Sequence, residues 1–339
     1  MRRAWGRHRQ RGATAVTVAL LLLALGGFAA LVVNVGHLFM VRGQLQNACD
    51  SAALAGAKEL DGTPGGLSRA VAKAAQFGDR FTTDRSVPVQ LSDQDIVLGH
   101  WDWARPKSQA FTPISVSDPG APLLVNAVRV LTGRSDARGN PLDVFLSAFS
   151  GNQTTAHIDA EAVAAGGGPA LAPCAVPFVF ADCLLQQDDQ IQCNQKLVLK
   201  NDQADNMGFT NLDPGVASVS TSDIISIFSG SCRSVAAGDS IGVSNGNNLN
   251  KNVVDAVNQY IAQNGAKVTV PVVSPIGGCP AQFNRVLPVV GFASFTITNV
   301  TGPPSPSVEI QLDCNATTES ERAGGGFFGT TDPHPGLVR

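Results

Sequence analysis

Charge is scarce in this sequence. Charged residues make up 15% of its 339 residues, and the formal net charge is −3, so the chain as a whole lacks the basic field that attracts nucleic acid. The chain instead carries 35 Gly and 20 Pro, and 44% of its residues are apolar. Low charge combined with many turn-forming residues is typical of an exported, loop-rich protein rather than a cytosolic enzyme. The length is sufficient for two modest domains beyond any membrane segment.

The N-terminal region lacks acidic residues and then lacks charge altogether. No Asp or Glu precedes Asp50, and no charged residue occurs between residues 13 and 41. This interval exceeds the roughly 20 residues that span a bilayer as a helix, whereas a cleavable export signal has an apolar core of about 7 to 15 residues. We therefore expect a permanent transmembrane helix at residues 12–41, with a cleaved signal as the alternative.

A basic segment at residues 1–11 precedes this helix. Positively charged residues remain on the cytoplasmic side of a membrane. The sequence therefore predicts a single-pass protein with a cytoplasmic N-terminus and with the bulk of the chain periplasmic or extracellular. The membrane-orienting residues are Arg2, Arg3, Arg7, Arg9 and Arg11.

No proline occurs between residues 13 and 60, which predicts that the helix continues beyond the membrane as a stalk and hairpin over residues 42–81. Small, apolar or uncharged polar residues recur along one face at the helical period. Such a face suits helix–helix contact, because small residues let backbones approach and an Asn can hydrogen-bond across the contact. This helix-packing stripe consists of Gly26, Ala30, Asn34, His37, Val41, Leu45, Ala48, Ala52 and Ala55.

The stripe has more than one interpretation. Outside the membrane it packs either on a partner chain or on the protein's own second helix, which we expect at Leu67–Phe81. Asn34 and His37 are also compatible with an ion path. A lone Asn and a His near the membrane exit are, however, more typical of helix packing and of the membrane interface.

The sequence contains no CxxC pair, which argues against structural zinc because zinc ligands usually occur as close pairs. Six of the seven cysteines lie in the C-terminal half, where an oxidising compartment favours disulfides whose pairing the sequence leaves open. The seventh, Cys49, lies on the N-terminal helix and is either unpaired or linked to a partner chain. The disulfide candidates are Cys174, Cys183, Cys193, Cys232, Cys279 and Cys314.

The segments "RGATAV" and "NVGHLFMVRGQLQNACDSAALAGA" resemble the N-terminal region of the TadE/TadG-like proteins of bacterial tight-adherence (Flp) pilus assembly. The resemblance extends over polar as well as apolar positions. It departs from the family pattern at Asn34, where Asp is usual, and at Cys49, where a small residue is usual. The resemblance implies a protein of the bacterial inner (cytoplasmic) membrane.

Pilin-like members of this family carry Glu at the fifth position after the glycine at which prepilin peptidase cuts. Counted from Ala13, that position is Thr17 in this sequence, and Thr cannot supply the charge that meets a new N-terminal amine. The resemblance therefore implies no prepilin processing and an anchored, TadG-like role. Longer TadG proteins end in a von Willebrand A domain with a D-x-S-x-S metal motif, and this sequence lacks that motif.

The predicted fold class is α+β, with the transmembrane helix and its stalk followed by two small β-rich units. A weaker resemblance to the family in "DIVLGHWDW" and "VNAVRVL" indicates a small α+β module at residues 94–165. Alternation of apolar and polar residues predicts strands in this module. One short helix is expected within it, at Leu142–Phe149.

The remaining chain is divided by composition. The segment "GGGPALAP" at residues 166–173 is typical of a linker. Residues 174–318 form a predicted cysteine-containing β-rich domain with one clear helix near Lys251–Gln263, introduced by Asn residues and followed by "NG". The Gly-rich, polar residues 319–339 are expected to form a flexible tail.

The sequence predicts no catalytic residue, no metal ligand and no cofactor. "GVSNG" at residues 242–246 matches the G-x-S-x-G nucleophile elbow. That motif requires alternating strands and helices and a later histidine, and the only later one, His334, lies in the expected tail. The Asp/Asn-rich segment Asn201–Gly208 misses the spacing of an EF-hand and is interpreted as a loop with at most weak cation binding.

Histidine and aspartate also occur beside two tryptophans on a predicted strand. Alternation places Trp101 and Trp103 on one face of the strand and His100 and Asp102 on the other. We interpret them as core packing and polar surface, because no nucleophile, base and orienting group come together in this sequence.

The sequence thus favours a non-enzymatic, membrane-anchored envelope protein that assists assembly of a tight-adherence pilus or its secretion machinery through helix–helix and domain contacts. Expected partners are inner-membrane lipid and other pilus or secretion assembly proteins, reached through the N-terminal helix. Neither nucleic acid nor a small-molecule substrate is expected. The alternative is a secreted or surface-exposed binding protein, or adhesin, that uses the disulfide-linked C-terminal domain. A periplasmic hydrolase is the least supported hypothesis.

Overall fold

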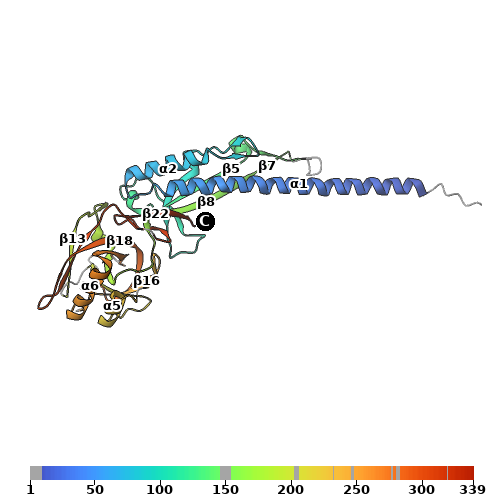
Figure 1. The fold of residues 1–339 in the computed structure, drawn as a ribbon. Coiled ribbons are helices and arrows are strands. Elements are labelled where there is room, and N and C mark those ends of the chain that lie inside the picture. Colours follow the sequence, from blue (N-terminus) through green and yellow to red (C-terminus); the bar gives the residue numbers. More distant parts are fainter. Residues whose placement is uncertain are drawn as a thin grey trace, which may run out of the picture.

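The chain forms one long helix that carries two β-rich domains at its C-terminal end (Figure 1). This arrangement is seen in a computed structural model and confirms the predicted α+β class. Side chains are described from residue 14 onward. The residues that the structure describes are 10–145, 154–201, 206–231, 233–245, 248–275, 278–279, 283–318 and 320–339.

The helices and strands alternate irregularly along the chain. The helices are α1 (Gln10–Ala57), α2 (Pro64–Gly78), α3 (Ala121–Leu124), α4 (Asp182–Leu185), α5 (Thr221–Phe228) and α6 (Lys251–Asn264), with 3-10 turns at Asp93–Asp95 and Asp136–Arg138. The strands are β1 (Thr82–Thr83), β2 (Val87–Pro88), β3 (Ile96–Trp101), β4 (Phe111–Pro113), β5 (Ala127–Arg134), β6 (Leu142–Asp143), β7 (Thr155–Ala156), β8 (Ile158–Pro169), β9 (Leu171–Ala172), β10 (Phe178–Ala181), β11 (Gln186–Gln187), β12 (Gln190–Ile191), β13 (Lys196–Lys200), β14 (Met207–Pro214), β15 (Val235–Ala236), β16 (Ser240–Ser244), β17 (Lys267–Val273), β18 (Arg285–Thr301), β19 (Ser307–Leu312), β20 (Ala316–Thr317), β21 (Ala323–Gly325) and β22 (Thr330–Leu337).

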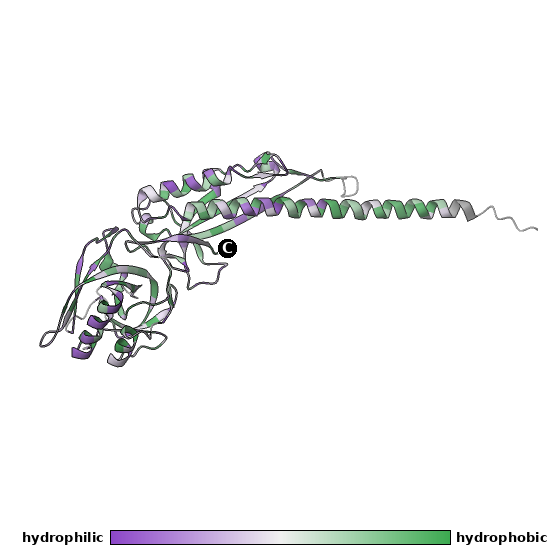
Figure 2. Ribbon diagram, in the orientation of Figure 1, coloured by the Kyte–Doolittle hydropathy of each residue, from purple (hydrophilic) through white to green (hydrophobic). Residues whose placement is uncertain are grey.

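Helix α1 is continuous over 48 residues. No proline interrupts it, and at 1.5 Å per residue it extends about 72 Å, more than twice the roughly 30 Å of a bilayer's hydrocarbon core. In Figure 2 the half nearer the N-terminus is hydrophobic along its length, whereas the half beside the other elements also carries hydrophilic residues. The two halves of one helix therefore belong to two environments.

Helix α2 begins where the sequence supplies a cap. The Thr63 hydroxyl accepts a hydrogen bond from the Gly66 amide, and Pro64 occupies the first turn, where no N–H donor is required. The helix then packs against the end of α1. The two helices approach closely at Gly56, where a Cβ atom would lie 2.9 Å from the Ala70 carbonyl oxygen. Glycine at position 56 therefore permits this helix–helix contact.

The first domain packs α1 and α2 on a sheet with the strand order β20-β22-β8-β5-β3-β4, with β21 also paired to β8. All these pairings are antiparallel except that between β20 and β22. The hydrophobic core lies between the helices and the sheet. Its side chains include Val41, Leu45, Ala48 and Ala52 of α1, Leu67, Ala70 and Ala74 of α2, and Ile96, Leu98, Val128 and Val130 of the sheet.

The last strand of the chain, β22, returns from the second domain to complete the sheet of the first. It pairs with β8, and the contact continues beyond it, where the Val338 amide donates to the Val163 carbonyl and Arg339 forms an ion pair with Glu161. The predicted flexible tail at residues 319–339 is therefore wrong. Its Gly- and Pro-rich composition is outweighed by the backbone partners that the edge of β8 offers.

The predicted linker at residues 166–173 is also wrong. Strand β8 continues to Pro169 and β9 follows it directly. At Gly166 a Cβ atom would overlap the carbonyl group of Ala57 at the end of α1. The glycines of this segment therefore allow close packing of helix and strand, where the sequence alone suggested flexibility.

The predicted helix at Leu142–Phe149 is wrong at its start. The structure places strand β6 at Leu142–Asp143, paired with β7, while residues 146–149 lie outside the described residues. Leu142 is buried in the first-domain core. Tertiary packing thus overrides a weak local preference for helix.

The second domain is built on a sheet that closes on itself. Its strand order is β13-β19-β18-β16-β14-β10-β17, and β17 pairs additionally with β18. Strand β18 is 17 residues long and permits this closure, because successive parts of it pair with β16 and with β17. Phe178, Phe180 and Phe295 fill the core, together with side chains from α5 and α6. Helix α6 coincides with the helix expected near Lys251–Gln263.

Two disulfides join distant segments of the second domain, Cys183 to Cys279 and Cys193 to Cys314. The paired residues are 96 and 121 positions apart in the sequence, so each bond restricts a long loop of the unfolded chain. The prediction of C-terminal disulfides is confirmed for these four cysteines. Cys232 lies outside the described residues, so Cys174 and Cys232 stay disulfide candidates whose partners the sequence leaves open.

Candidate functional site

The first half of α1 is an exposed apolar surface. The segment Thr14–Ala57 is long and apolar enough to cross a membrane, and its most apolar window is 6% buried. Leu22, Phe28 and Val32 are 63%, 68% and 70% exposed. Water-exposed apolar surface of this extent is unusual in a folded domain. This half of the helix is therefore suited to lipid.

The predicted membrane-orienting arginines lie at the N-terminal end of this helix. Arg2, Arg3, Arg7 and Arg9 lie outside the described residues. Arg11 belongs to α1, but its side chain is also outside the described set. Their cytoplasmic location therefore remains a prediction.

The C-terminal part of the helix-packing stripe is buried within the chain itself. Val41, Leu45, Ala48 and Ala52 are enclosed in the first-domain core against α2 and the sheet. Ala55 is half-buried beside α2. At these positions the stripe packs on the protein's own second helix and sheet, which is one of the two interpretations that the sequence leaves open.

The N-terminal part of the stripe lies in the apolar half of α1. Gly26, Asn34 and His37 are half-buried and Ala30 is buried. The side-chain oxygen of Asn34 is enclosed and accepts no hydrogen bond from any residue that the structure describes. An amide oxygen without a donor is unfavourable in apolar surroundings. Asn34 is therefore the stripe position in this half where a donor from another chain would stabilise most.

His37 joins α1 to one end of the first domain. Its Nε2 donates to Oδ1 of Asp84 at 2.9 Å, and the guanidinium group of Arg134 lies 3.4 Å from the second carboxylate oxygen. The hydrogen bond from His37 is the main reason that the pKa of Asp84 lies below its ordinary value. The sequence reasoning missed Asp84, because no local pattern connects it with a histidine 47 positions away.

Cys49 is enclosed in the first-domain core. It has no exposed surface, and its thiol donates to the Ala160 carbonyl at 3.3 Å. Burial raises the pKa of the Cys49 thiol to about 12. An enclosed, neutral thiol is unreactive. Of the two alternatives for Cys49, the structure supports the unpaired one and excludes a disulfide to a partner chain in this fold.

The G-x-S-x-G match is not part of a catalytic arrangement. Ser244 ends strand β16 of the second domain, and its hydroxyl donates to Oδ1 of Asn284 at 3.0 Å. His334 lies on β22 in the sheet of the first domain. The two residues that a hydrolase would need together thus belong to different sheets.

The tryptophan segment has a structural role. Trp101 ends strand β3 and is buried, and Trp103 packs against it edge-to-face with ring centroids 6.1 Å apart. The indole N–H of Trp103 donates to the Gly324 carbonyl at 2.7 Å, which joins the first domain to β21. His100 and Asp102 lie beside this joint, partly exposed.

The predicted weak cation loop at Asn201–Gly208 is only partly visible, because residues 202–205 lie outside the described residues. It therefore stays a prediction. Across the part of the chain that the structure describes, no three or more His, Cys, Asp or Glu side chains are arranged to hold a metal ion.

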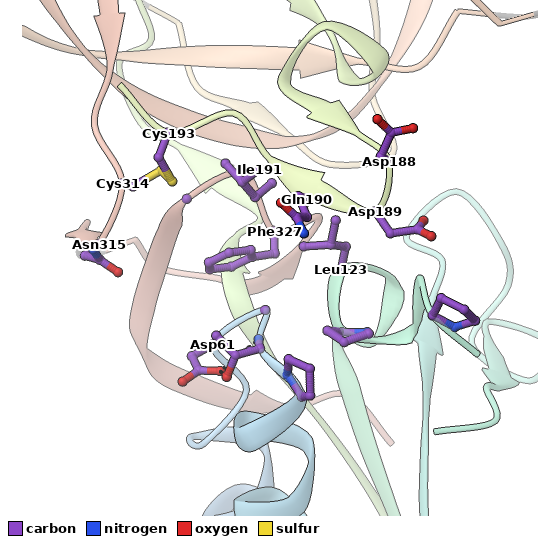
Figure 3. Close-up of a pocket in the computed structure, with 16 residues that line it drawn as sticks. Asp61, Leu123, Asp188, Asp189, Gln190, Ile191, Cys193, Cys314, Asn315 and Phe327 are labelled. Atoms are coloured by element: carbon purple, nitrogen blue, oxygen red, sulfur yellow. Dashed lines mark hydrogen bonds between the residues drawn. A yellow bond between two sulfur atoms is a disulfide. The ribbon is translucent and has the colours of Figure 1, made fainter. Parts of the chain in front are cut away.

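Two adjoining hollows form an acidic groove, which the sequence reasoning also missed. The first, of about 510 Å³, lies where the two domains meet and is shown in Figure 3, with Leu123, Ile191 and Phe327 at its centre. The second, of about 540 Å³, continues along α2. The carboxylates that line the acidic groove are Asp61, Asp118, Asp188 and Asp189.

A basic groove of about 810 Å³ lies between α1 and α2. Leu54, Phe77 and Phe81 provide apolar surface within it. The guanidinium group of Arg80 stacks on the Phe77 ring, 4.4 Å from its centroid. The charged residues that line the basic groove are Lys58, Lys73, Arg80 and Glu59, of which Glu59 is paired with Arg69 outside the groove.

Two protein-family models match the chain. The model described as Flp pilus-assembly TadE/G-like matches residues 12–59, and the model described as Tad-like Flp pilus-assembly matches residues 55–164. The first match corresponds to α1, and the second to α2 with the strands up to β8. Neither a curated protein nor a solved structure matches the chain.

Proposed function

Residues 12–164 of the chain belong to the TadE/TadG-like family of Flp pilus-assembly proteins, and from this premise we propose that the protein is a non-enzymatic, membrane-anchored assembly component. It stays in the inner membrane with its N-terminus in the cytoplasm and its domains outside. Its activity is contact with other pilus or secretion assembly proteins. Thr17 in place of the glutamate of pilin-like relatives supports an anchored role rather than polymerisation into the fibre.

The observation that carries this proposal is the double use of α1. Its first half exposes large apolar side chains on all faces, while its second half is the centre of the first-domain core. The helix runs without a break from the apolar half into the core half, so a retained span is joined to the first domain by continuous helix. Helix α1 therefore serves both as the membrane anchor and as part of the first domain (Figure 1).

The ion pair between Asp84 and Arg134 lies next to His37 and supports a position for the end of the membrane span. Asp84 binds His37, and the buried guanidinium group of Arg134 pairs with Asp84; charged groups are unfavourable in the hydrocarbon core. Residues 14 to 36 rise about 34 Å as a helix, which matches the roughly 30 Å core of a bilayer. We therefore propose that the span meets the non-cytoplasmic surface of the inner membrane near His37. The first domain then lies close to the lipid surface.

Within the span, the N-terminal part of the helix-packing stripe is the proposed contact for a partner helix. Gly26 and Ala30 are four residues apart and allow close backbone approach, and Asn34 follows on the same face. The enclosed Asn34 oxygen lacks a donor among the described residues. A partner helix that supplies this donor would be held specifically.

The proposal is tested with the substitution Asn34→Leu and photo-cross-linking in native membranes. A cross-linker placed at the half-buried Gly26 is expected to capture another component of the pilus machinery, and Asn34→Leu should reduce the yield about fivefold, corresponding to about 1 kcal/mol for one interhelical hydrogen bond. Val33→Leu, on an exposed face of the same turn, serves as the matched control and should leave the yield unchanged. An identical yield for Asn34→Leu and wild type would contradict this use of the stripe.

A further inference from the structure

The two flanks of α2 carry opposite charge. Lys73, Phe77 and Arg80 face the basic groove, whereas Leu67 and Val71 face the acidic groove. At 100° per residue, these two sets point about 130° apart around the helix axis, with Arg80 just beyond the end of α2. Helix α2 therefore separates a basic, apolar surface from an acidic, apolar one.

Arg69 neutralises Asp61 of the acidic groove and Glu59 of the basic groove, whereas the other charged residues of the two grooves lack partners of opposite sign among the described residues. Within the part of the chain that the structure describes, Lys58, Lys73 and Arg80 form no ion pair, and neither do Asp118, Asp188 and Asp189. Like charges gathered around apolar surface repel one another, and a partner of opposite sign relieves that repulsion. Each flank is thus complementary in charge to the other flank of a second copy.

An exposed apolar side chain lies between carboxylates at the rim of the acidic groove, and this rim segment is called the knob. Val116 is 59% exposed and Asp118 is exposed beside it on the loop that precedes α3. Asp189 approaches the same loop, since a Cβ atom at Gly120 would lie 2.9 Å from its Oδ1. An apolar side chain flanked by carboxylates is therefore presented outward, and the groove between α1 and α2 offers apolar walls flanked by cations.

Both surfaces begin at the C-terminal end of α1, the helix that carries the proposed membrane anchor. Lys58 lines the basic groove and Asp61, three residues later, lines the acidic groove. Copies anchored side by side in one bilayer have parallel helices, so a basic groove on one copy meets an acidic knob on its neighbour by lateral movement. Contacts of this head-to-tail kind continue from copy to copy and produce a row or a closed ring.

We propose that the protein associates with itself in the membrane, the knob of Val116 and Asp118 of one copy entering the basic groove of the next. The apolar contact supplies affinity, and the charges of Asp118 and Asp189 against Lys58 and Arg80 set the register. This inference goes beyond the role in pilus assembly and does not depend on it, because the association requires only copies of this chain.

The test uses two variants of the full-length chain, purified in detergent and examined by sedimentation velocity. Lys58→Glu with Arg80→Glu removes the groove, and Val116→Ser with Asp118→Asn removes the knob without creating a charge that fits the altered groove. Wild type is expected to form oligomers larger than dimers, and each variant alone should associate at least about tenfold more weakly. An equimolar mixture of the two variants should form dimers and nothing larger, because one intact groove and one intact knob remain.

The matched control, Lys196→Glu with Lys267→Glu, makes the same charge change on exposed residues of the second domain and should assemble like wild type. Unchanged thermal unfolding of every variant shows that the fold is intact. Monomeric wild type, variants that assemble normally, or a mixture that stays monomeric would each overturn the proposal. The Asn34 cross-link to another protein is unaffected by these outcomes, so the two proposals fail separately.

Discussion

The thiol of Cys49 lies against the Ala160 carbonyl inside the first-domain core. Ionising it there would place a charge without a counter-ion in an apolar environment, which explains why its pKa rises to about 12. The enclosure also prevents reagents from reaching the sulfur. Cys49 therefore acts as a packing residue of α1, and its thiol is unreactive in the folded protein.

We expect Cys49 to resist alkylation in the folded protein. Iodoacetamide at pH 8 should leave Cys49 unmodified under native conditions and modify it completely in denaturant, as measured by peptide mass spectrometry. The substitution Ser51→Cys, placed in the half-exposed wall of the basic groove, provides a control that reacts in both conditions. Native modification of Cys49 at the rate of the control would contradict its placement in the core.

Asp95 carries a buried charge that Arg138 neutralises. Both terminal guanidinium nitrogens of Arg138 reach its carboxylate, and the Ser92 amide and hydroxyl donate to it as well. Burial acts to raise the pKa of Asp95, but the hydrogen bonds from Arg138 and Ser92 outweigh burial and hold it below its ordinary value of 3.8. The folded state thus binds this proton more weakly than the unfolded state. The ion pair is fully stabilising above pH 3.8, and its contribution is lost as pH falls through the native pKa.

Asp95→Asn should therefore destabilise the protein by about 2 kcal/mol at pH 7, because a buried, charge-assisted hydrogen-bond group is lost. The difference from wild type should shrink as the pH is lowered below 3.8, where Asp95 of the wild type becomes protonated. Urea unfolding followed by fluorescence measures both effects, and the exposed neighbour Asp93→Asn is the control. A destabilisation that does not change with pH would exclude the ion pair as its cause.

Among the elements, α1 could be predicted almost completely from the sequence. Its uncharged interval, the absence of proline and its period are all local signals, and they hold over 48 residues. Its environment could not be predicted in full, because the burial of Leu45 and Ala48 depends on α2 and β8, which are distant in sequence. The grooves on either side of α2 were likewise missed, since each combines residues from three or more separate segments.

Strand β22 shows the limit of local reasoning most clearly. Pro333, Pro335 and Gly336 are typical of loops. Strand β20 pairs with β22 at Thr330 and Thr331, and both prolines lie beyond this pairing, where the strand tolerates them because N–H groups on that side need no strand partner. The information that makes residues 330–337 a strand resides in the open edge of β8, more than 160 positions earlier in the chain. The two prolines also leave this edge of the sheet poorly suited to further strand addition.

Truncation of residues 330–339 should destabilise the first domain by about 3 kcal/mol or more. The loss removes Val338 from its cluster with Trp101 and Val163 and exposes the edge of β8. Limited proteolysis should then cleave the first domain faster than in wild type. The substitution Arg339→Ala keeps the backbone contact with Val163, breaks only an exposed ion pair with Glu161 and should have little effect. Equal protease resistance of the truncated and intact chains would show that β22 does not hold this sheet.

At the scale of the whole molecule, the second domain is tied to the anchor by its own C-terminal strands. Strands β21 and β22 pair with β8, and the Gly324 carbonyl accepts hydrogen bonds from Trp103 and Asn126 of the first domain. The chain thus leaves the first domain, forms the closed second sheet and comes back. The second domain is therefore held against the first domain by strand pairing and hydrogen bonds rather than joined to it by a flexible linker. Such an arrangement suits a protein that presents surfaces at a fixed distance from a membrane.

Membrane fractionation tests the central claim most directly. The account predicts a full-length polypeptide that resists carbonate extraction and still carries the arginine-rich peptide ahead of α1, detected by mass spectrometry of its N-terminus. A soluble, folded mature form that begins near residue 30 would contradict the account.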